Sequence, residues 1–381
     1  MNKWIPFFSF YDDEGIETVT SKDQKNTEMQ VFNQKKSEFY INRNNIRDYL
    51  ISIISSPPNS FHQYSSQEPW IPYHFILSFS LLSFHKLRNI QLFKEACSKY
   101  IFKRQSKYGG YGPSPHEIGH VALTYTSINT IALTLNEANF QSIDRHSLYN
   151  WFMSLKQPNG SFSSSEGYPY ECDTRSTYCV ISVASLLNIL TPELTKNTAA
   201  FLSSCQGYDG GFGPIPGSET HGGYGFCALA ALDLLGALDT IDANSAIKWC
   251  SMRQMPFCGG FNGRTNKLVD TCYTWWVGAM CKILSDRTGT APFWNDEALA
   301  TYVLTVCQNV DGSCGGFKDK PGKKVDMFHT MYGLAGLSAA CRNLIKEKTG
   351  FELEEMDARY CVTKAAAEMM KSYFAAIPFE Y

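Results

Sequence analysis

The sequence predicts an all-α fold in which about six pairs of helices close into a double ring, an α/α toroid, around a central funnel. Two observations carry this prediction: a motif recurs with a period near 50 residues, and an apolar stretch of helical length flanks each copy. In addition, aromatic residues make up 14% of the chain, more than a core of this size needs. This excess indicates that some aromatic side chains line a cavity.

The recurring motif is a glutamine followed by a glycine-rich turn and an aromatic residue. Five copies begin at Gln105, Gln157, Gln206, Gln254 and Gln308, so successive copies are 48 to 54 residues apart. A period of this length, held over about two hundred residues, is typical of repeat architectures.

Each turn lies between two expected helices, so one repeat is an outer helix, a turn and an inner helix. The inner set is the more apolar and spans residues 121–135, 174–190, 222–235, 271–284 and 330–344. The outer set is shorter and more polar and spans residues 89–102, 147–155, 194–204, 242–252 and 296–307.

Two further helices, near residues 70–87 and 357–375, bring the count to about six pairs. An open solenoid needs polar caps at both ends, whereas these two helices are apolar enough to pack on each other. We therefore expect a closed ring over residues 61–381. Residues 1–60 are polar and weakly periodic, and we expect them to form an N-terminal arm with a short helix.

Charge and cysteine usage exclude several classes of function. The 34 basic and 36 acidic residues give a net charge of −2, which argues against binding to nucleic acid. The longest apolar run, residues 180–190, is too short to span a bilayer, so we expect that this chain is not an integral membrane protein. The 13 cysteines include no Cys-x-x-Cys pair, and the first ten residues lack a secretory signal, which together indicate a cytoplasmic protein.

The repeat register places polar side chains at matching positions. His120, His221, Asp270 and Asp326 each lie ten residues after the second glycine of their turn. If the inner helices run the same way, their N-termini gather at one rim of the funnel, where N–H groups and helix dipoles suit an anion such as phosphate.

Two basic clusters lie close to this expected rim. Arg264 and Lys267 precede Asp270, and four lysines at 318, 320, 323 and 324 precede His329. A single cluster would indicate only a solvated face. Two clusters at matching positions of neighbouring repeats favour an anion site.

Asp270, Cys272 and His329 offer a carboxylate, a thiolate and an imidazole, three ligand types that Zn²⁺ accepts. Three protein ligands leave one coordination position open, as in catalytic zinc sites. From spacing alone, the alternative that Cys272 is a small buried hydrophobe stays open.

Residues His116 to His120 fit the His-Glu-x-x-His pattern of zinc metalloproteases, which needs one continuous helix through both histidines. Pro113 and Pro115 lie just upstream and Gly119 lies inside the pattern, so a continuous helix is disfavoured. The metalloprotease stays as an alternative. The sequence has no phosphate-binding Gly-x-x-x-x-Gly-Lys loop and no Gly-x-Ser-x-Gly elbow.

Four stretches, at residues 221–227, 253–261, 263–273 and 319–329, resemble the β subunits of protein prenyltransferases, and the farnesyltransferase group is the most similar. The resemblance extends from about residue 17 to about residue 344. It implies an α/α toroid around an aromatic-lined funnel, in agreement with the ring argued from the repeats. It also implies transfer of a C15 isoprenoid from farnesyl diphosphate to the cysteine of a C-terminal Cys-a-a-X sequence, as a thioether.

The same resemblance assigns roles to individual residues. It implies that Asp270, Cys272 and His329 bind zinc, with Tyr273 and Lys267 completing the catalytic set, and that Asp319 binds Mg²⁺. The residues it implies for the diphosphate are His221, Arg264, Lys267, Tyr273 and Lys320. Those it implies for the isoprenoid are Trp70, Tyr125, Arg175, Tyr178, Tyr224, Cys227, Trp276 and Tyr332.

The resemblance favours a farnesyl donor. Trp70 and Tyr332 match bulky residues that shorten the pocket in farnesyltransferases, and Asp319 matches a position that holds lysine in the geranylgeranyl relatives. A geranylgeranyltransferase type I subunit, or an enzyme of dual specificity, stays open, because His74 and Phe328 depart from the farnesyl pattern.

The resemblance also implies a heterodimer with a helical-repeat α subunit that supplies a lysine to the diphosphate site. The other partners expected for this chain are farnesyl diphosphate and Cys-a-a-X proteins such as small GTPases. Nucleic acid is not expected to be a partner. An alternative from another class is a helical scaffold without catalysis, which gives no reason for these polar residues to gather at one rim.

Overall fold

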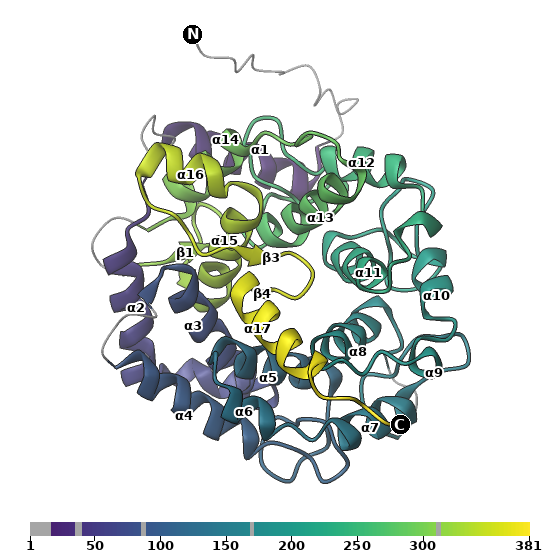
Figure 1. Cartoon of the computed structure of the whole chain (residues 1–381). Helices are drawn as coiled ribbons and strands as arrows, with labels where there is room; N and C mark the ends of the chain where they lie inside the picture. The colour runs from purple at the N-terminus through teal and green to yellow at the C-terminus, as the bar shows by residue number, and fades with distance from the viewer. Residues whose placement is uncertain (1–16, 35–39, 85–88, 168–170, 310–313) are drawn as a thin grey trace.

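The computed structural model describes residues 17–34, 40–84, 89–167, 171–309 and 314–381. Within these ranges the only strands form two short antiparallel hairpins: β1 (Phe317–Lys318) with β2 (Val325–Asp326), and β3 (Met356–Asp357) with β4 (Val362–Thr363). Figure 1 shows the helices in two concentric rings. The predicted all-α toroid is therefore confirmed.

Six helices of the described chain form the inner ring: α3 (Trp70–Leu81), α5 (Val121–Leu133), α8 (Thr174–Leu186), α11 (Gly222–Leu234), α13 (Tyr273–Thr288) and α15 (Met327–Ala340). The outer ring consists of α2 (Arg43–Ser55), α4 (Ile90–Phe102), α7 (Arg145–Leu155), α10 (Thr198–Ser204), α12 (Ala243–Ser251), and α14 (Asp296–Thr301) with a π-helical continuation (Tyr302–Cys307). The inner helices begin within three residues of their predicted starts.

The remaining elements connect or flank these rings. They are α1 (Val19–Gln34), α6 (Glu137–Gln141), α9 (Pro192–Thr195), α16 (Arg342–Thr349), α17 (Lys364–Ala375) and the 3₁₀ segments Asn59–Gln67 and Leu238–Thr240. No helix of the described residues is both long and apolar enough to cross a bilayer.

Three of the repeat glutamines, Gln206, Gln254 and Gln308, tie their turn to the start of the next outer helix. Gln206 donates to the carbonyl of Asp242 and accepts from its N–H, both at 2.9 Å, and Gln254 makes the same pair of bonds with Asn295 at 2.8 Å. Asp242 and Asn295 are the N-caps of α12 and α14. In these copies the motif is therefore a clamp between neighbouring repeats.

The last clamp closes the outer ring. Gln308 donates to the carbonyl of Tyr40 and accepts from the N–H of Asn42, which is the N-cap of α2. A Cβ on Gly315 would lie 1.9 Å from the carbonyl oxygen of Asn45, so the fifth turn packs directly on α2. Helix α2 thus follows α14 in the outer ring although it lies before residue 60, and the boundary of the N-terminal arm stays a prediction.

The inner ring closes where α15 packs on α3. The expected contact between α3 and the C-terminal helix was the wrong explanation of closure, because α17 packs instead on α5, α6 and α8. Figure 1 shows α17 lying across one end of the ring. Six repeats already complete the circle, so the C-terminal segment is left to cover the opening.

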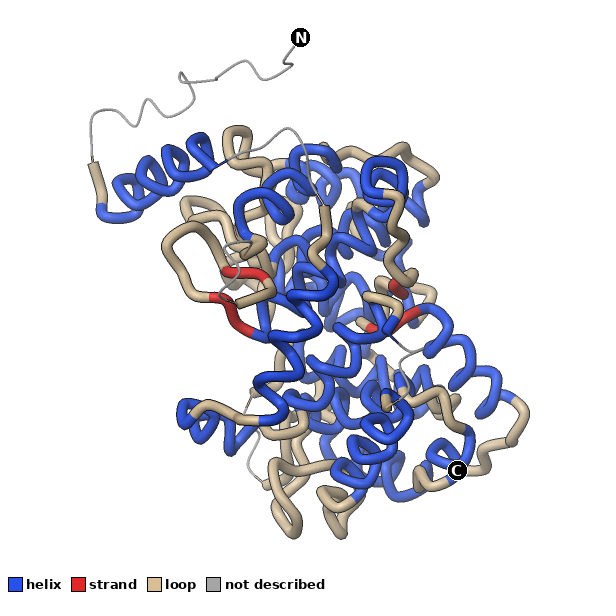
Figure 2. Tube along the Cα trace, turned by 90° about the vertical axis from the view of Figure 1, so that its left-hand side faces the viewer, coloured by secondary structure: helices blue, strands red, loops and turns tan. Residues whose placement is uncertain are grey.

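The hairpin β3–β4 forms a floor at that end of the funnel. The tyrosine hydroxyls of Tyr125 and Tyr178 donate to the carbonyls of Tyr360 and Arg359, both at 2.9 Å, and Tyr73 donates to the carbonyl of Cys361. Figure 2 shows β1–β2 at the opposite end of the ring from β3–β4. The floor and the rim described next therefore lie at opposite ends.

Candidate active site at the rim of the ring

The N-termini of the inner helices lie at one rim, as the register predicts. The N–H groups of Val121, Thr174, Gly222 and Thr271 each donate to a carbonyl in the turn of the following repeat, at 2.8 to 3.0 Å. Hydrogen bonds between consecutive repeats therefore join the starts of α5, α8, α11 and α13 along this rim.

Asp270, Cys272 and His329 come together at this rim, with one ligand atom of each within 4.8 Å of the others. The Nε2 atom of His329 lies 3.3 Å from Oδ1 of Asp270. That separation is about the edge of a tetrahedron with metal–ligand bonds of about 2.0 to 2.1 Å, so this pair is spaced as two zinc ligands would be. The mixed carboxylate, thiol and imidazole set also fits zinc better than Mg²⁺ or Ca²⁺, which prefer oxygen ligands.

Burial and the neighbouring carboxylates together shift the pKa values of His329 and Cys272. Burial lowers the pKa of His329, but hydrogen bonds to Asp270 and Asp326 outweigh it and raise that pKa to about 10. Burial, and then the carboxylate of Asp270, raise the pKa of the Cys272 thiol well above its usual value. A divalent cation bound here would displace the proton from His329 and favour the thiolate of Cys272.

Asp326 holds His329 in place, a role that the sequence analysis did not assign. Its Oδ1 accepts from the backbone N–H of His329 at 2.8 Å as the N-cap of α15, and its Oδ2 lies 2.6 Å from Nδ1 of the same residue. Because Nδ1 is occupied, Nε2 is the nitrogen left to bind a metal. The spacing of three residues from an N-cap aspartate to a histidine could have indicated this contact.

A hollow of about 320 Å³ opens on the rim at the starts of α8 and α11. It is lined by Arg175, His221, Gly223, Tyr224 and Arg264. Its two guanidinium groups pair with carboxylates at its edge: Arg175 with Asp173 and Glu171, and Arg264 with Glu219. An anion entering this hollow would meet both arginines and the N-terminus of α11.

One tyrosine links the metal-ligand cluster to this hollow. Tyr273 follows Cys272 directly, and its hydroxyl lies 3.0 Å from Nε2 of His221. As the N-cap of α11, His221 accepts from the N–H of Gly223 through Nδ1, so its proton resides on Nε2 and is donated to Tyr273. The phenolic proton of Tyr273 is then directed elsewhere, and is available to a bound anion.

The other two predicted anion groups have different surroundings. The ammonium of Lys320 pairs with Oδ2 of Asp319 at 2.6 Å, while Oδ1 of Asp319 is buried without a hydrogen-bond partner among the described residues. Lys267 is exposed on the same loop as Arg264. The structure therefore brings Lys320 to the metal-ligand cluster through Asp319 and leaves Lys267 in solvent.

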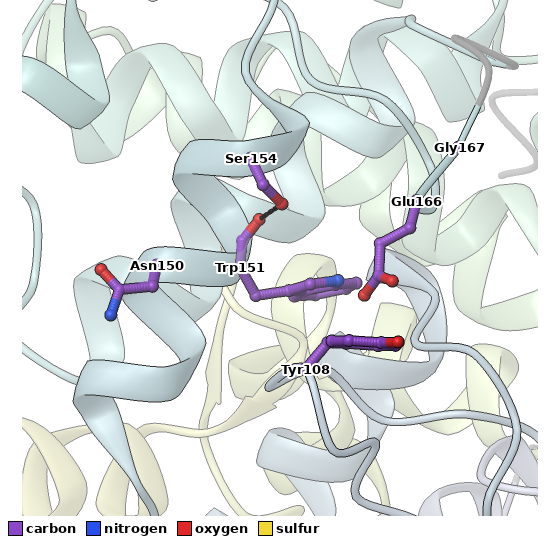
Figure 3. A pocket seen from close by; sticks show the side chains of 6 residues that line it. All are labelled: Tyr108, Asn150, Trp151, Ser154, Glu166 and Gly167. Carbon is purple, nitrogen blue, oxygen red and sulfur yellow. Dashed lines mark hydrogen bonds between the residues drawn. The ribbon is translucent and has the colours of Figure 1, made fainter.

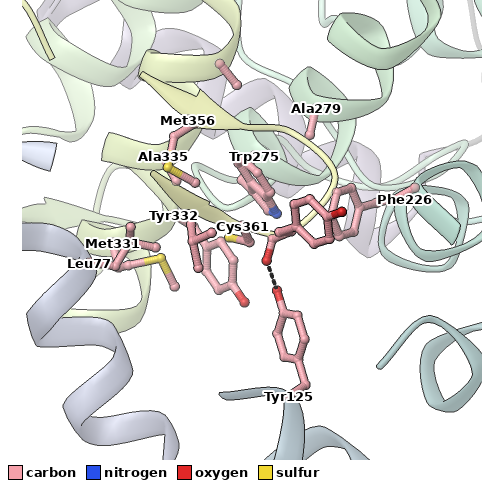
Figure 4. Close-up of a cluster of buried hydrophobic side chains, with 14 of the residues drawn as sticks. Leu77, Tyr125, Phe226, Trp275, Ala279, Met331, Tyr332, Ala335, Met356 and Cys361 are labelled. Atoms are coloured by element: carbon pink, nitrogen blue, oxygen red, sulfur yellow. Dashed lines mark hydrogen bonds between the residues drawn. The ribbon is translucent and has the colours of Figure 1, made fainter. Parts of the chain in front are cut away.

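Below the rim, aromatic contacts run all the way round the funnel, one or two rings from each inner helix. Each ring contacts the next, and the centroids of neighbouring rings lie 4.6 to 6.3 Å apart. In order around the funnel the rings are those of Trp70, Tyr125, Tyr178, Phe226, Trp276, Tyr332 and His74, which contacts Trp70 again. Figure 4 shows Tyr125, Phe226 and Tyr332 converging near the floor residue Cys361. The predicted aromatic lining is thus a continuous belt.

The predicted isoprenoid residues divide between these two places. Trp70, Tyr125, Tyr178, Trp276 and Tyr332 belong to the belt, and Cys227 is buried next to Phe226 in α11. Arg175 and Tyr224 instead lie at the hollow, where the guanidinium of Arg175 lies 5.0 Å from the ring centroid of Tyr224. Sequence analysis missed Phe226, whose place in the belt follows from its position in α11.

The His-Glu-x-x-His pattern does not lie on a helix. His116 is exposed in a turn with φ of +71°, and His120 is the N-cap of α5. In the described ranges the only three-residue cluster with metal-ligand geometry is that of Asp270, Cys272 and His329. The argument against a protease helix is therefore confirmed.

His74 contributes the one imidazole of the aromatic belt. It stacks on Trp70 at 5.6 Å and contacts Phe328 and Tyr332, and neither ring nitrogen has a hydrogen-bond partner among the described residues. Burial lowers the pKa of its imidazole to about 4. The native state therefore takes up this proton only at a lower pH than the unfolded chain, whose histidine has its ordinary pKa near 6.5.

This difference predicts an acid sensitivity of the fold. The contribution of His74 to the free energy of unfolding is fully present above about pH 6.5 and is lost as pH falls towards 4, by about 2 kcal/mol between pH 7 and pH 5. We expect the variant His74→Phe to lose this part of the pH dependence, as measured by urea unfolding at pH 5 to 7.5. Equal slopes in the two proteins would assign the acid sensitivity to other groups.

Comparisons with known proteins agree with this architecture. The family described as "Prenyltransferase alpha-alpha toroid domain" matches residues 41–362. The chain is 36% identical over 351 residues to protein farnesyltransferase subunit beta of Schizosaccharomyces pombe, covering 86% of this chain and 88% of that protein. It is 34% identical over 238 residues to geranylgeranyl transferase type-1 subunit beta of Arabidopsis thaliana, covering 60% of each.

Among solved structures, the fold is similar to that of Candida albicans protein geranylgeranyltransferase-I complexed with GGPP. The TM-score is 0.76 at 20% identity, over 88% of this chain and 99% of that one. With the family match over most of the chain and the similarity to a farnesyltransferase subunit, these results show that the chain belongs to the protein prenyltransferase β-subunit family.

Proposed function

We propose that this chain is the catalytic β subunit of a zinc-dependent protein farnesyltransferase. Its reaction would join a farnesyl group to the cysteine of a C-terminal Cys-a-a-X sequence. The observation that carries the proposal is that the cluster of Asp270, Cys272 and His329 adjoins the basic hollow through a single residue, Tyr273. A nucleophile held at the cluster would face a diphosphate held in the hollow.

In this proposal the metal is zinc and Asp270, Cys272 and His329 hold it. When bound, the ion would lower the pKa of the acceptor cysteine, so that its sulfur reacts as a thiolate. The C–S bond forms at C1 of the isoprenoid while the C1–O bond to the diphosphate breaks, and the thiol proton leaves to solvent.

The residues of the hollow act on the leaving group. Arg264 and Tyr273 would donate to the diphosphate oxygens, on which negative charge grows as the C1–O bond breaks. The Nε2–H of His221 would turn from Tyr273 to the same oxygens. The side chain of Lys267 is long and exposed, so its ammonium could reach the diphosphate. The ammonium of Lys320 would turn from Asp319 towards the diphosphate as well. The unpartnered Oδ1 of Asp319 offers an oxygen ligand for Mg²⁺ bound with the diphosphate.

The aromatic belt would bind the isoprenoid and set its length. Trp70 and Tyr332 are joined through His74 on one side of the belt, above a floor tied down by Tyr73, Tyr125 and Tyr178. Bulky side chains over a closed floor favour a C15 chain over a C20 chain. Arg175, Tyr224, Cys227 and Trp276 complete the proposed lining.

A geranylgeranyl donor is the second candidate, and the similarity to a type-1 geranylgeranyl transferase subunit favours it. Under either donor we propose a cytoplasmic heterodimer with a prenyltransferase α subunit, acting on Cys-a-a-X proteins such as small GTPases. The farnesyltransferase subunits among its relatives support this assembly.

The test is to purify the chain with its α subunit and measure transfer of radiolabelled farnesyl and geranylgeranyl groups to Cys-a-a-X peptides. Zinc content and the effect of Mg²⁺ are measured on the same sample. About one zinc per heterodimer and Mg²⁺-stimulated farnesyl transfer are expected. Geranylgeranyl transfer without Mg²⁺ would overturn the roles of Trp70, Tyr332 and Asp319, and the absence of both zinc and transfer would favour the scaffold.

A further inference from the structure

Two tryptophans occupy equivalent places in the outer ring, and only one has its indole N–H satisfied. Trp151 of α7 and Trp249 of α12 are each 2% exposed. Each packs on the second glycine of the preceding turn, where a Cβ on Gly110 or Gly211 would lie 2.5 Å from the indole. The two sites therefore share one backbone arrangement.

At the Trp249 site the protein itself supplies hydrogen-bond acceptors. Nε1 of Trp249 lies 3.1 Å from Oδ2 of Asp209 and 3.0 Å from the hydroxyl of Thr220. These residues lie two before and nine after Gly211. The same count from Gly110 reaches Tyr108 and Gly119, neither of which has a side chain that can replace that carboxylate and hydroxyl.

The Trp151 site consequently keeps an unsatisfied donor beside a cavity. Nε1 of Trp151 is buried and has no hydrogen-bond partner within the described residues, and the same is true of Oε1 of Glu166. A cavity of about 410 Å³ is lined by both residues together with Tyr108, Asn150, Ser154 and Gly167. Figure 3 shows the indole nitrogen at the end of the ring nearest the Glu166 carboxylate, with the Tyr108 ring below the indole.

These groups specify the chemistry of a ligand. A ligand that satisfies both groups accepts from the Trp151 N–H and donates to the Glu166 carboxylate, and a buried group left without a partner costs about 1 to 3 kcal/mol. It should be flat, because aromatic rings of Tyr108 and Trp151 form two of the walls. An ammonium or guanidinium has no acceptor for the indole, and a carboxylate is repelled by Glu166.

A carboxamide meets both requirements, because its carbonyl accepts while its NH₂ donates in the same plane. We propose that the cavity between Tyr108, Trp151 and Glu166 is a binding site for a planar carboxamide group. The cavity shares no residue with the metal-ligand cluster or the basic hollow, and the proposal does not depend on the proposed transferase activity. The carboxamide could be that of a small aromatic amide or that of a glutamine side chain, and the two are distinguished experimentally.

The experiment uses the full chain, purified with its α subunit and labelled with ¹⁵N in the tryptophan indoles. Nicotinamide, N-acetylglutamine methylamide and nicotinate are titrated separately, and the indole N–H resonances of Trp151 and Trp249 are followed by NMR. We expect a carboxamide to shift the Trp151 resonance saturably and to leave that of Trp249 unchanged. Nicotinate, of the same shape but with a carboxylate, should bind at least about tenfold more weakly.

Tighter binding of nicotinamide would identify a small aromatic amide as the ligand, and tighter binding of the glutamine derivative would identify a protein side chain. Two variants test the mechanism. Glu166→Ala should weaken binding at least about tenfold, and Tyr108→Asp, at an exposed position, should supply an internal acceptor to Trp151 and abolish binding. Both variants should retain their prenyl-transfer rate. Failure of both carboxamides to shift Trp151, or equal shifts of Trp249, would overturn the proposal.

Discussion

Replacement of Cys272 by alanine is expected to remove bound zinc and to lower prenyl transfer by at least about 10³-fold, or about 4 kcal/mol in the activation barrier. Cys272 supplies the only sulfur ligand of the cluster and is 6% exposed. Removing its thiol leaves Asp270 and His329, whose charges already compensate each other at 3.3 Å. Two ligands that pair with one another hold a metal poorly.

The matched control is His116→Ala, which removes a histidine from the metalloprotease pattern. His116 is exposed in a turn, so this variant should keep both its zinc and its transfer rate. Metal content is measured by atomic emission on the purified heterodimer, and transfer by incorporation of radiolabelled isoprenoid. If His116→Ala lost the zinc and Cys272→Ala kept it, the metal would be bound at the His-Glu-x-x-His pattern of residues 116–120 instead.

Replacement of Gly336 by alanine is expected to destabilise the ring by about 3 kcal/mol. A Cβ on Gly336 would lie 2.2 to 2.5 Å from the backbone atoms of Thr274 and Trp275, so α15 rests directly on the backbone of α13. Backbone cannot move aside as a side chain can, and the two helices must separate. Because Cys272 precedes α13 and His329 lies on α15, we also expect weaker zinc retention.

The matched control is Gly278→Ala in the facing helix. There a Cβ would lie 3.3 Å from the Cβ of Ala340, a contact that a small shift relieves. Alanine is also favoured over glycine inside a helix by about 1 kcal/mol, so the net effect should be near zero or stabilising. Urea unfolding of the two variants measures the difference, and similar losses in both would show that the close approach at Gly336 is not the cause.

The repeat register predicted the ring and its rim because the turns are local. The glutamine clamp and the glycine contacts both act within one repeat and its neighbour, so their spacing is visible in the sequence. The same register could also have indicated the difference between Trp151 and Trp249, since it aligns Tyr108 with Asp209.

The repeat register did not predict the β3–β4 hairpin that forms the floor of the funnel. Tyr73, Tyr125 and Tyr178 bond to backbone carbonyls, which every residue carries, so no side-chain pattern marks their partners. The helix after the floor was predicted, but its position was wrong. An apolar face does not specify which of several apolar surfaces will cover it.

The order in which the chain is synthesised bears on the closure of the ring. Helix α3 is buried along most of its length, yet its partner α15 and the floor hairpin come about 250 to 290 residues later in the sequence. At about 5 to 20 residues per second, a ribosome needs roughly 15 to 60 s to supply them. During that interval α3 has only α5 of its two neighbours in the inner ring, so its surface towards α15 stays uncovered. We therefore expect the nascent chain to need a chaperone, and the aromatic belt and its floor to stay incomplete until residues 327–363 have been made.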